Sequence, residues 1–268
     1  MKAQKLFRAG KNLKVVDADA AKKLLSSGDK LQDKARTEQL GQQIAALQDV
    51  FYAAQGRKLL VVLQGMDTSG KDGTVSGVFG KIDPLGIRCI PFKAPTAEER
   101  AHDFLWRIHR QLPAQGEMVI FNRSHYEDVL ITRVHGWIDS SECKRRYAHI
   151  CDFERMLAET GTVLLKFFLH LSKDEQKARL EERLADPDKH WKFDPEDLKE
   201  REFWNDYQQA YAQALLATDA DHAPWFVIPA DSKTQRNLAI ASIVLEALEG
   251  MKLAYPPPHP EYAKIKIV

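Results

Sequence analysis

The sequence predicts a three-layer α/β/α fold, in which a parallel sheet of five strands lies between two layers of helices. Short apolar runs alternate along the chain with longer stretches of helical spacing, and this alternation is typical of parallel strands joined by right-handed helical crossovers. The runs are nearly continuously apolar, as strands are when both faces of a sheet are covered. The first run ends in a glycine-rich loop that precedes a helix, an arrangement that suits the binding of phosphate.

The elements are predicted in the following order. Residues 18–57 read as helical, because apolar side chains such as Leu40, Ile44 and Leu47 recur at helical spacing. Residues 1–57 should therefore form a helical N-terminal arm packed on the core. The strands are expected at residues 58–63, 88–92, 117–121, 163–169 and 225–229. The remaining helices of the core are expected at residues 71–80, 97–112, 139–159 and 232–250.

One long insertion separates the fourth and fifth predicted strands. Residues 172–222 contain no strand pattern and read as charged helices, interrupted at residues 186–197 by a loop that holds two prolines. A helical excursion at this place is typical of a lid that closes over a site, carried here by a core domain of residues 58–250. The proline-rich residues 251–268 are expected to form an extended tail, on the surface or on a neighbouring subunit.

Composition excludes several classes of partner. The 268 residues carry a formal net charge of +1, which provides no overall field for nucleic acid or a membrane surface. No apolar run approaches the ~20 residues of a membrane span, and the N-terminal residues lack the apolar core of a secretory signal. The three cysteines show no Cys-x-x-Cys spacing, which favours free thiols in a reducing compartment. We therefore expect a cytoplasmic protein that binds any polyanion in a local basic groove.

The strongest functional signal is the loop Gly65-x-x-x-x-Gly70-Lys71 between the first strand and its helix. Glycines let successive backbone N–H groups point at phosphate oxygens, the helix start adds positive potential, and Lys71 supplies a mobile charge. In the Walker A pattern a Ser or Thr that ligates Mg²⁺ follows the lysine, but Asp72 stands here. Asp67, inside the loop, could bind Mg²⁺ or act as a base. The alternatives are a turn residue for Asp67 and a favourable helix start for Asp72.

A second group of polar residues follows the third predicted strand. Ligands gather at the carboxyl ends of parallel strands, so Asn122 and Arg123 should lie beside the phosphate loop if the third strand neighbours the first. Arg123 can bind phosphate through both arms of its guanidinium group, or neutralise charge that develops during transfer. Glu127 and Asp128 could hold Mg²⁺ or a ribose hydroxyl. A solvated surface position is the alternative for Arg123, Glu127, Asp128 and Arg133.

Five ordered motifs resemble those of family 2 polyphosphate kinases over about residues 35–250: GMDTSGKDG, PFKAPTAEE, VIFNRSHYED, DPDKHWKF and WFVIPADSK. The resemblance implies a P-loop kinase fold with a helical lid. It also implies an enzyme that uses inorganic polyphosphate and Mg²⁺, with Mn²⁺ as a substitute, to phosphorylate nucleotides, reversibly in many members. FNRS followed by HYED, in place of FDRS followed by WYNR, resembles the subgroup that phosphorylates both AMP and ADP. Asn122 stands where the FDRS pattern has an aspartate, and an amide lacks the charge of that carboxylate. The resemblance therefore does not imply a metal-binding role for Asn122.

The motifs and the resemblance together assign the site. Catalytic roles are expected of Asp67, Lys71 and Arg123. Nucleotide or phosphate binding is expected of Gly65, Thr68, Ser69, Gly70, Asp72, Gly73, Thr74, Asn122, Glu127 and Asp128. Because a long polyanion needs spaced cations rather than one pocket, polyphosphate binding is expected of Lys81, Lys93, Arg133, Arg183, Lys189 and Lys192. Asp67 and Asp128 are the expected ligands of Mg²⁺.

The predicted function is that of a polyphosphate-dependent nucleotide kinase, which transfers the terminal phosphoryl group to AMP, ADP or both, with guanine nucleotides as further candidate acceptors. One alternative is an ATP-dependent kinase of nucleoside monophosphates or another small molecule, which would share the fold and the loop. The other alternative is a non-catalytic nucleotide sensor that uses the same cleft. The helical arm and the proline-rich tail suggest, by analogy of fold, a homodimer or homotetramer.

Overall fold

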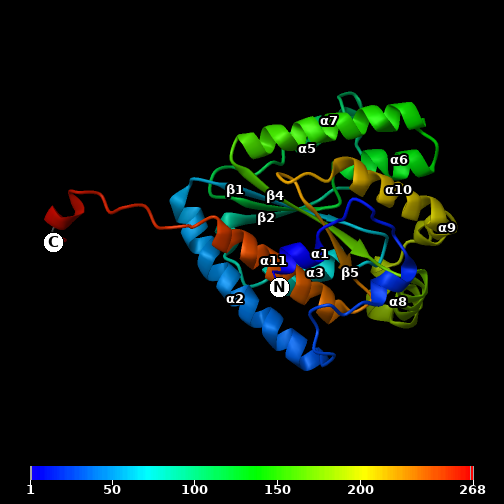
Figure 1. Ribbon diagram of the computed structural model, residues 1–268, viewed down its shortest axis with the longest axis horizontal. Helices are drawn as coiled ribbons and strands as arrows, with labels where there is room; N and C mark the ends of the chain where they lie inside the picture. The colour runs from blue at the N-terminus through cyan, green and yellow to red at the C-terminus, as the bar shows by residue number, and fades with distance from the viewer. Residues whose placement is uncertain (1, 266, 268) are drawn as a thin grey trace.

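The computed structural model describes residues 2–265 and 267, and in it a five-stranded sheet lies between two layers of helices (Figure 1). The strands are β1 (Lys58–Gln64), β2 (Ile87–Pro91), β3 (Met118–Asn122), β4 (Thr162–His170) and β5 (Trp225–Pro229). Their order in the sheet is β2-β3-β1-β4-β5, and every neighbouring pair is parallel. The predicted α/β/α fold is therefore confirmed, and each strand lies within one residue of its predicted bounds.

Helices cover both faces of the sheet. The longer ones are α2 (Lys30–Ala54), α3 (Lys71–Phe79), α7 (Ser140–Glu159), α8 (Lys173–Ala185), α10 (Trp204–Thr218) and α11 (Lys233–Gly250). The shorter ones are α1 (Ala3–Phe7), α4 (Ala97–Arg100), α5 (Trp106–His109), α6 (Ile131–Val134) and α9 (Glu196–Glu202). Turns of 3-10 helix occur at η1 (Asp17–Ala21), η2 (Pro84–Gly86), η3 (His125–Val129), η4 (Pro187–Lys192) and η5 (Tyr262–Lys264). In the part of the chain that the structure describes, no helix combines the length and apolar character needed to span a bilayer.

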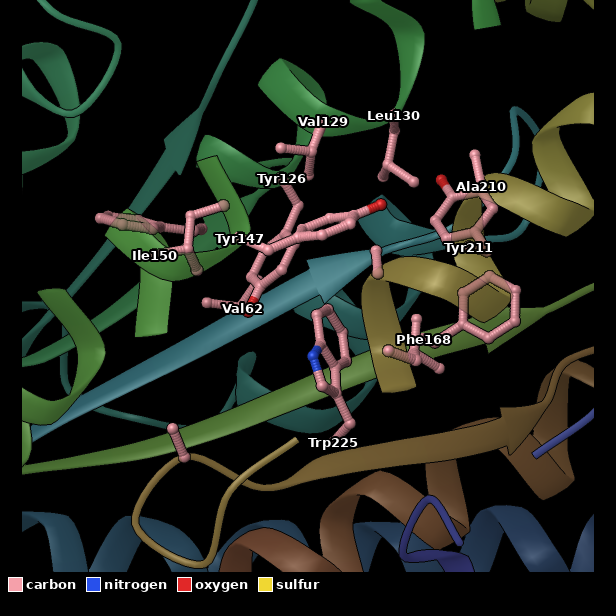
Figure 2. Packing of buried hydrophobic residues seen from close by; sticks show 14 of the residues in the cluster. Val62, Tyr126, Val129, Leu130, Tyr147, Ile150, Phe168, Ala210, Tyr211 and Trp225 are labelled. Atoms are coloured by element: carbon pink, nitrogen blue, oxygen red, sulfur yellow. The ribbon is translucent and has the colours of Figure 1, made fainter. Parts of the chain in front are cut away.

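The strands contribute to two separate hydrophobic cores, because successive side chains of a strand point to opposite faces. In β1 the side chains at positions 59, 61 and 63 pack with α2, α3 and α11. Leu60 and Val62 pack with α7 and α10 instead, where Tyr126 and Trp225 fill the space beside the sheet (Figure 2). The prediction that all strands are covered on both faces is wrong for β2, which is only half-buried because it lies at the edge of the sheet.

Two predicted helices differ from the structure. The pattern predicts one helix over residues 18–57, but α2 begins only at Lys30. Asp29 caps it by accepting a hydrogen bond from the backbone N–H of Leu31 at 2.8 Å, a typical helix start. The helix predicted over residues 97–112 is two short helices, α4 and α5. Between them the side chain of Asp103 accepts the N–H of Leu105 at 2.9 Å, and such bonds compete with helical ones.

The insertion between β4 and β5 consists of α8, η4, α9 and α10. The last of these helices belongs to the core, since Trp204, Tyr207 and Tyr211 are buried in the cluster shared with α7. By contrast, η4 and α9 contain no buried residue. A mobile lid would therefore be narrower than residues 172–222 and would centre on η4 and α9. The lid and the domain boundaries remain predictions.

The C-terminal segment runs away from the body of the molecule (Figure 1). Residues 252–265 contain no regular element apart from η5, and the tail is fastened near its start by a hydrogen bond from the hydroxyl of Tyr255 to the carboxylate of Asp49 in α2. The extended tail over residues 251–268 remains a prediction, and its residues 266 and 268 lie outside the described part of the chain.

Candidate active site

The loop between β1 and α3 has the backbone geometry of a phosphate-binding loop. Gly65 and Gly70 have φ angles of 156° and 95°, in the region that favours glycine. A Cβ atom at Gly65 would lie 2.7 Å from the carbonyl oxygen of Leu169, and one at Gly70 would lie 1.7 Å from a guanidinium nitrogen of Arg236. Glycine is therefore required at both ends of the loop, where neighbouring groups approach its backbone closely.

Two buried arginines hold this loop from behind. Arg236 of α11 donates a hydrogen bond to the carbonyl oxygen of Ser69 at 3.2 Å, and Arg179 of α8 donates to that of Thr68 at 2.9 Å. Arg179 also donates to the carbonyl oxygen of Ala230 at 2.8 Å, which ties the loop to the end of β5. Burial, and next the charge of Arg179, lowers the pKa of Arg236 to about 10, so it remains charged at neutral pH. Two fixed positive charges beneath the loop favour an anion in it.

Three hydroxyl groups of the loop and of the first turn of α3 have unused hydrogen-bonding capacity. The Oγ atoms of Thr68, Ser69 and Thr74 are buried and have no partner among the described residues. Buried polar groups are normally hydrogen-bonded, and a hydroxyl can donate to a phosphate oxygen. A phosphate group held in the loop would satisfy them, which supports the roles predicted for these three residues.

Lys71 lies beneath the loop at the start of α3. Its ammonium group donates to the carbonyl oxygens of Gly65 at 2.9 Å and Met66 at 3.3 Å. Burial, followed by the charge of Arg123, lowers the pKa of Lys71 to about 8, although Asp67 acts in the opposite direction. At neutral pH Lys71 is therefore mainly cationic, and it lines the cavity above the loop.

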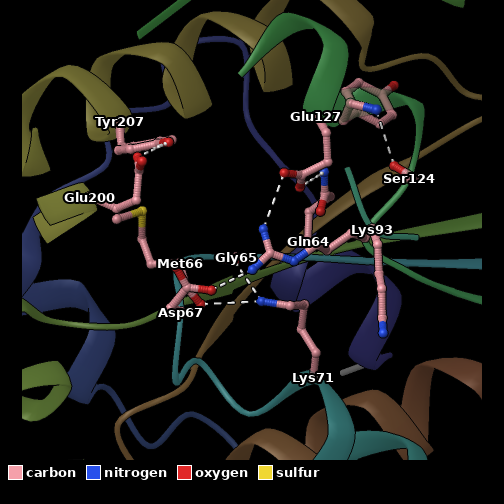
Figure 3. A network of polar contacts seen from close by, with 12 residues as sticks. Gln64, Gly65, Met66, Asp67, Lys71, Lys93, Ser124, Glu127, Glu200 and Tyr207 are labelled. Carbon is pink, nitrogen blue, oxygen red and sulfur yellow. Dashed lines mark hydrogen bonds and ion pairs between the residues drawn. The ribbon is translucent and has the colours of Figure 1, made fainter. Parts of the chain in front are cut away.

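Asp67 and Glu127, from separate sequence motifs, face a common point beside the loop (Figure 3). The guanidinium group of Arg123 occupies this point, 2.5 Å from Asp67 Oδ1 and 3.2 Å from Glu127 Oε2. Gln64, the last residue of β1, donates to the other oxygen of Glu127 at 3.1 Å. Burial alone would raise the pKa of Asp67, but Arg123 and Lys71 outweigh it and hold this pKa below its usual value. Asp67 is thus ionised at neutral pH.

The end of β3 meets the start of α3 beside the loop. Leu63 of β1 is paired in register with Asn122 of β3, so the carboxyl ends of the two strands are adjacent, as predicted. The side-chain amide of Asn122 donates to Asp72 Oδ1 at 2.6 Å. Asn122 thereby orients the carboxylate that replaces the Walker A hydroxyl.

A cavity of about 540 Å³ opens above the loop. The predicted site residues that line it are Asp67, Thr68, Gly70, Lys71, Asp72, Gly73, Lys93, Asn122, Arg123, Arg183, Lys189 and Lys192. Ser69 and Thr74 are fully buried beneath it, and Gly65 forms the start of the loop. The structure therefore brings the three predicted catalytic residues together with cations of the insertion.

Four further predicted residues belong neither to the loop nor to the lining of this cavity. Asp128 pairs with Arg107 at 3.5 Å, and burial raises its pKa. Arg133 lines a separate cavity beside α7, and Lys81 pairs with a glutamate of α2 at 3.2 Å. Glu127 lines a small cavity of about 20 Å³ behind the loop and acts on the site through Arg123. The geometry of the described residues gives no support to Asp128 as a metal ligand or to Arg133 as a polyphosphate-binding residue.

Several residues that line the cavity were not assigned from the sequence: Arg179, Glu182, Asp194, Asp197, Lys233 and Arg236. The sequence could have indicated Lys233 and Arg236 as site residues. Both lie in the first turn of the helix that follows the last strand, and this turn is at the carboxyl edge of the sheet. Arg179 gives no such signal, since it lies in a helix rich in charged residues. Asp197 pairs with Arg183 at 3.5 Å; burial, and next the charge of Asp67, raises its pKa to about 7.

Asp67 is the carboxylate best placed to hold Mg²⁺. The described residues contain no group of three or more His, Cys, Asp or Glu side chains that could hold a metal ion alone. Mg²⁺ usually takes only one or two protein carboxylates and completes its shell with substrate phosphates and water. An ionised Asp67 beside a phosphate-binding loop fits this pattern, and Asp72 and Asp197 line the same cavity.

The chain is similar to known proteins along most of its length. The family model described as "Polyphosphate kinase 2 (PPK2)" matches residues 27–256. The AMP/ADP-polyphosphate phosphotransferase of Meiothermus ruber is 51% identical over 229 residues, which are 85% of this chain and 85% of its relative. The ADP-polyphosphate phosphotransferase of Rhodopseudomonas palustris is 41% identical over 235 residues, which are 83% of this chain and 81% of its relative.

The same family is found among solved structures. The crystal structure of polyphosphate kinase 2 from Arthrobacter aurescens TC1 superimposes with a TM-score of 0.95 at 44% sequence identity, covering 98% of this chain and 95% of the other. The likeness therefore includes the loop, the second motif and the insertion that together form the cavity. This chain belongs to the polyphosphate kinase 2 family.

Proposed function

We propose that the protein transfers the terminal phosphoryl group of inorganic polyphosphate to AMP, ADP or both, in a reversible reaction. The observation that carries this proposal is the convergence of Asp67, Lys71 and Arg123 on one open cavity. The names of the relatives from Meiothermus ruber and Rhodopseudomonas palustris support polyphosphate as the donor and adenine nucleotides as acceptors. The first of these names supports the use of both AMP and ADP.

The charge of the cavity suits a donor that is a chain of phosphates. Nine lysine and arginine residues line it against five acidic ones, whereas the whole chain has a net charge of only +1. The cations also come from separate elements, including α3, α8, η4 and α11. A polyanion that extends beyond one pocket is stabilised by such a distributed set of positive charges.

Direct in-line transfer suits the residues present, because phosphoryl transfer depends on positioning and electrostatic stabilisation rather than on covalent chemistry by the protein. Lys71 and the loop would hold the donor phosphates, and Arg123 would neutralise charge on the group in transfer. Asp67 would hold Mg²⁺ or Mn²⁺, whose charge would offset that of the phosphates. The acceptor phosphate is largely ionised at neutral pH, so the reaction needs no general base. Because the phosphoryl group passes directly from donor to acceptor, it also needs no covalent enzyme intermediate.

The insertion is suited to closing over bound substrates. Lys189 pairs with Glu182 at 2.9 Å and with Asp186 at 3.0 Å, and Arg183 pairs with Asp197 at 3.5 Å. Ion pairs near the surface contribute only ~0–1 kcal/mol, so a phosphate chain can take these cations from their carboxylate partners. Such an exchange would draw η4 and α9 over the cavity and exclude water from the reaction.

Three wider expectations belong to the same proposal. The protein would act in the cytoplasm as a homodimer or homotetramer, and it would accept guanine nucleotides in addition to adenine nucleotides. Size-exclusion chromatography with light scattering measures the oligomeric state, and fractionation of the producing cells measures the location. An acceptor profile with AMP, ADP and GMP, with polyphosphate as the sole donor, measures the base preference.

The decisive experiment supplies AMP, polyphosphate and Mg²⁺ and omits every nucleoside triphosphate. ADP should form, and ATP should form when ADP is the acceptor. Lys71→Met should lower the rate by about 10²-fold or more, because it removes a charge at the transferring phosphate. Lys177→Met is the matched control, since Lys177 is exposed on α8 and, among the residues that the structure describes, pairs with Glu181 alone. Product that forms only after ATP is added would support the ATP-dependent kinase, and tight nucleotide binding without turnover would support the sensor.

A further inference from the structure

A second groove adjoins the active-site cavity. It has a volume of about 440 Å³ and lies among α2, α3 and α11, three helices that contact one another on the same side of the sheet (Figure 1). Lys233, at the start of α11, lines both this groove and the active-site cavity. The two spaces therefore adjoin at Lys233, whose side chain can contact a ligand in either one.

The groove has the chemistry of a surface that binds polyanions. Its charged lining consists of three lysines, Lys34, Lys81 and Lys233, and one acidic residue, Glu38. Hydroxyl and amide side chains from all three helices line the space between these charges. Toward α3 the lining includes glycine at positions 77 and 80, so no side chain from these positions blocks the passage. The groove is therefore open, hydrogen-bonding and positively charged.

We propose that this groove is a second binding site for the inorganic polyphosphate donor, which holds the units of a long chain that extend beyond the active-site cavity. The inference rests on the proposed function. Helix α3 has 9 residues and is therefore about 13 Å long, so Lys81 lies roughly that far from the phosphate loop. A short donor is contained in the cavity, whereas a long chain that passes Lys233 runs along α3 to Lys81 and Lys34.

The ion pairs at the groove do not oppose this use. Lys81 lies 3.2 Å from Glu38, and both side chains are 58% exposed. Lys233 lies 3.6 Å from Glu182. Exposed pairs of this kind are weak, and a chain with a charge on every unit offers each lysine a stronger partner than one carboxylate. The groove therefore makes the enzyme discriminate between donors by length, without any change at the residues that transfer the phosphoryl group.

The test compares a long-chain polyphosphate with tripolyphosphate as donors for AMP. The double variant Lys34→Met/Lys81→Met should raise the ratio of KM for the long chain to KM for tripolyphosphate by about fourfold or more, at two- to fivefold for each lysine. Glu38→Gln should lower the same ratio, because it removes the competing carboxylate. Lys177→Met, which loses an exposed helical ion pair and lines neither the groove nor the active-site cavity, should leave the ratio unchanged.

A binding measurement that needs no turnover accompanies the kinetics. The dissociation constant of long-chain polyphosphate is measured at several salt concentrations, and the slope of log Kd against log salt should decrease by about 2 in the double variant, one for each lost lysine contact. Equal increases in KM for both donors, or a ratio and slope like those of Lys177→Met, would overturn the proposed groove. A parent protein that binds long-chain polyphosphate with the steeper slope, yet transfers nothing to AMP or ADP, would refute the proposed function and leave the groove supported.

Discussion

Replacing Lys166 with methionine should destabilise the protein by about 3–5 kcal/mol. Lys166 lies in β4, and its ammonium nitrogen is 2.6 Å from Glu154 Oε2 of α7. It also donates to the hydroxyl of Tyr126 at 2.9 Å and to the carbonyl oxygen of Thr218 at 2.8 Å. The side chains of Lys166 and Glu154 are 0% and 1% exposed, so water cannot take the place of a lost partner.

The magnitude follows from the charge that the substitution leaves behind. Burial raises the pKa of Glu154, but the charge of Lys166 and then the contact with His125 lower it by more, so the net pKa is below its usual value. Without Lys166 the carboxylate is an uncompensated charge in the core, and breaking a buried pair in this way costs about 3–5 kcal/mol. For a chain of this size each kcal/mol corresponds to ~2–4 °C, so Tm should fall by roughly 6–20 °C.

Urea denaturation of the parent, Lys166→Met, Glu154→Gln and the double variant measures this effect. The double variant should regain at least half of the lost stability, because no charge is then buried and the amide oxygen still accepts from the hydroxyl of Tyr126. Lys166→Met alone should also regain stability at lower pH, where protonation neutralises Glu154. A double variant as unstable as Lys166→Met, with no dependence on pH, would show that lost packing rather than buried charge is the cause and would refute the reasoning.

Three changes at the site itself have separate expected outcomes. Gly70→Ala should abolish turnover and lower Tm, because its Cβ would lie 1.7 Å from a guanidinium nitrogen of Arg236 at a φ of 95°; activity and thermal unfolding measure both. Asp67→Asn should lower kcat by about 10²-fold, whereas Asp128→Asn, outside the cavity, should leave kcat close to that of the parent. Lys71 has a pKa of about 8 in the folded protein against 10.5 for the free side chain, so the unfolded chain binds more protons between these values. Over that pH window the unfolding free energy of the parent should rise relative to Lys71→Met by up to about 3 kcal/mol, and a constant difference would contradict the assignment.

The sheet and the phosphate loop could be predicted because their signals are local. A buried parallel strand needs a continuous apolar run, and the loop needs glycine where a Cβ would collide, as at Gly65 and Gly70. The start of α2 was missed for a local reason as well. Asp29 and the serines that precede it form a capped turn. The prediction used only the helical spacing of the later apolar residues, which contains no information about this turn.

The site was less predictable where neighbours in sequence diverge in space. Glu127 and Asp128 are consecutive residues of the 3-10 turn η3, in which successive side chains are about 120° apart. One therefore reaches Arg123 and the other reaches Arg107. Arg179 and Arg236 could not be found by spacing, because their partners are backbone carbonyl groups brought near only by the folded sheet.

The buried charge network and the active site meet in one short segment. Arg123 has a φ of 64°, a conformation that strains a residue other than glycine and persists only where its surroundings enforce it. Three residues later Tyr126 is fixed in the core, where its hydroxyl donates to Glu154 at 2.9 Å and lies 3.0 Å from the hydroxyl oxygen of Thr218. The turn between them is closed by a bond from the N–H of Tyr126 to the hydroxyl of Ser124 at 3.2 Å. The hydrogen bonds of Tyr126 in the core thus hold Arg123 in its strained position between Asp67 and Glu127. The buried ion pair of Lys166 and Glu154 therefore positions Arg123 in addition to stabilising the fold.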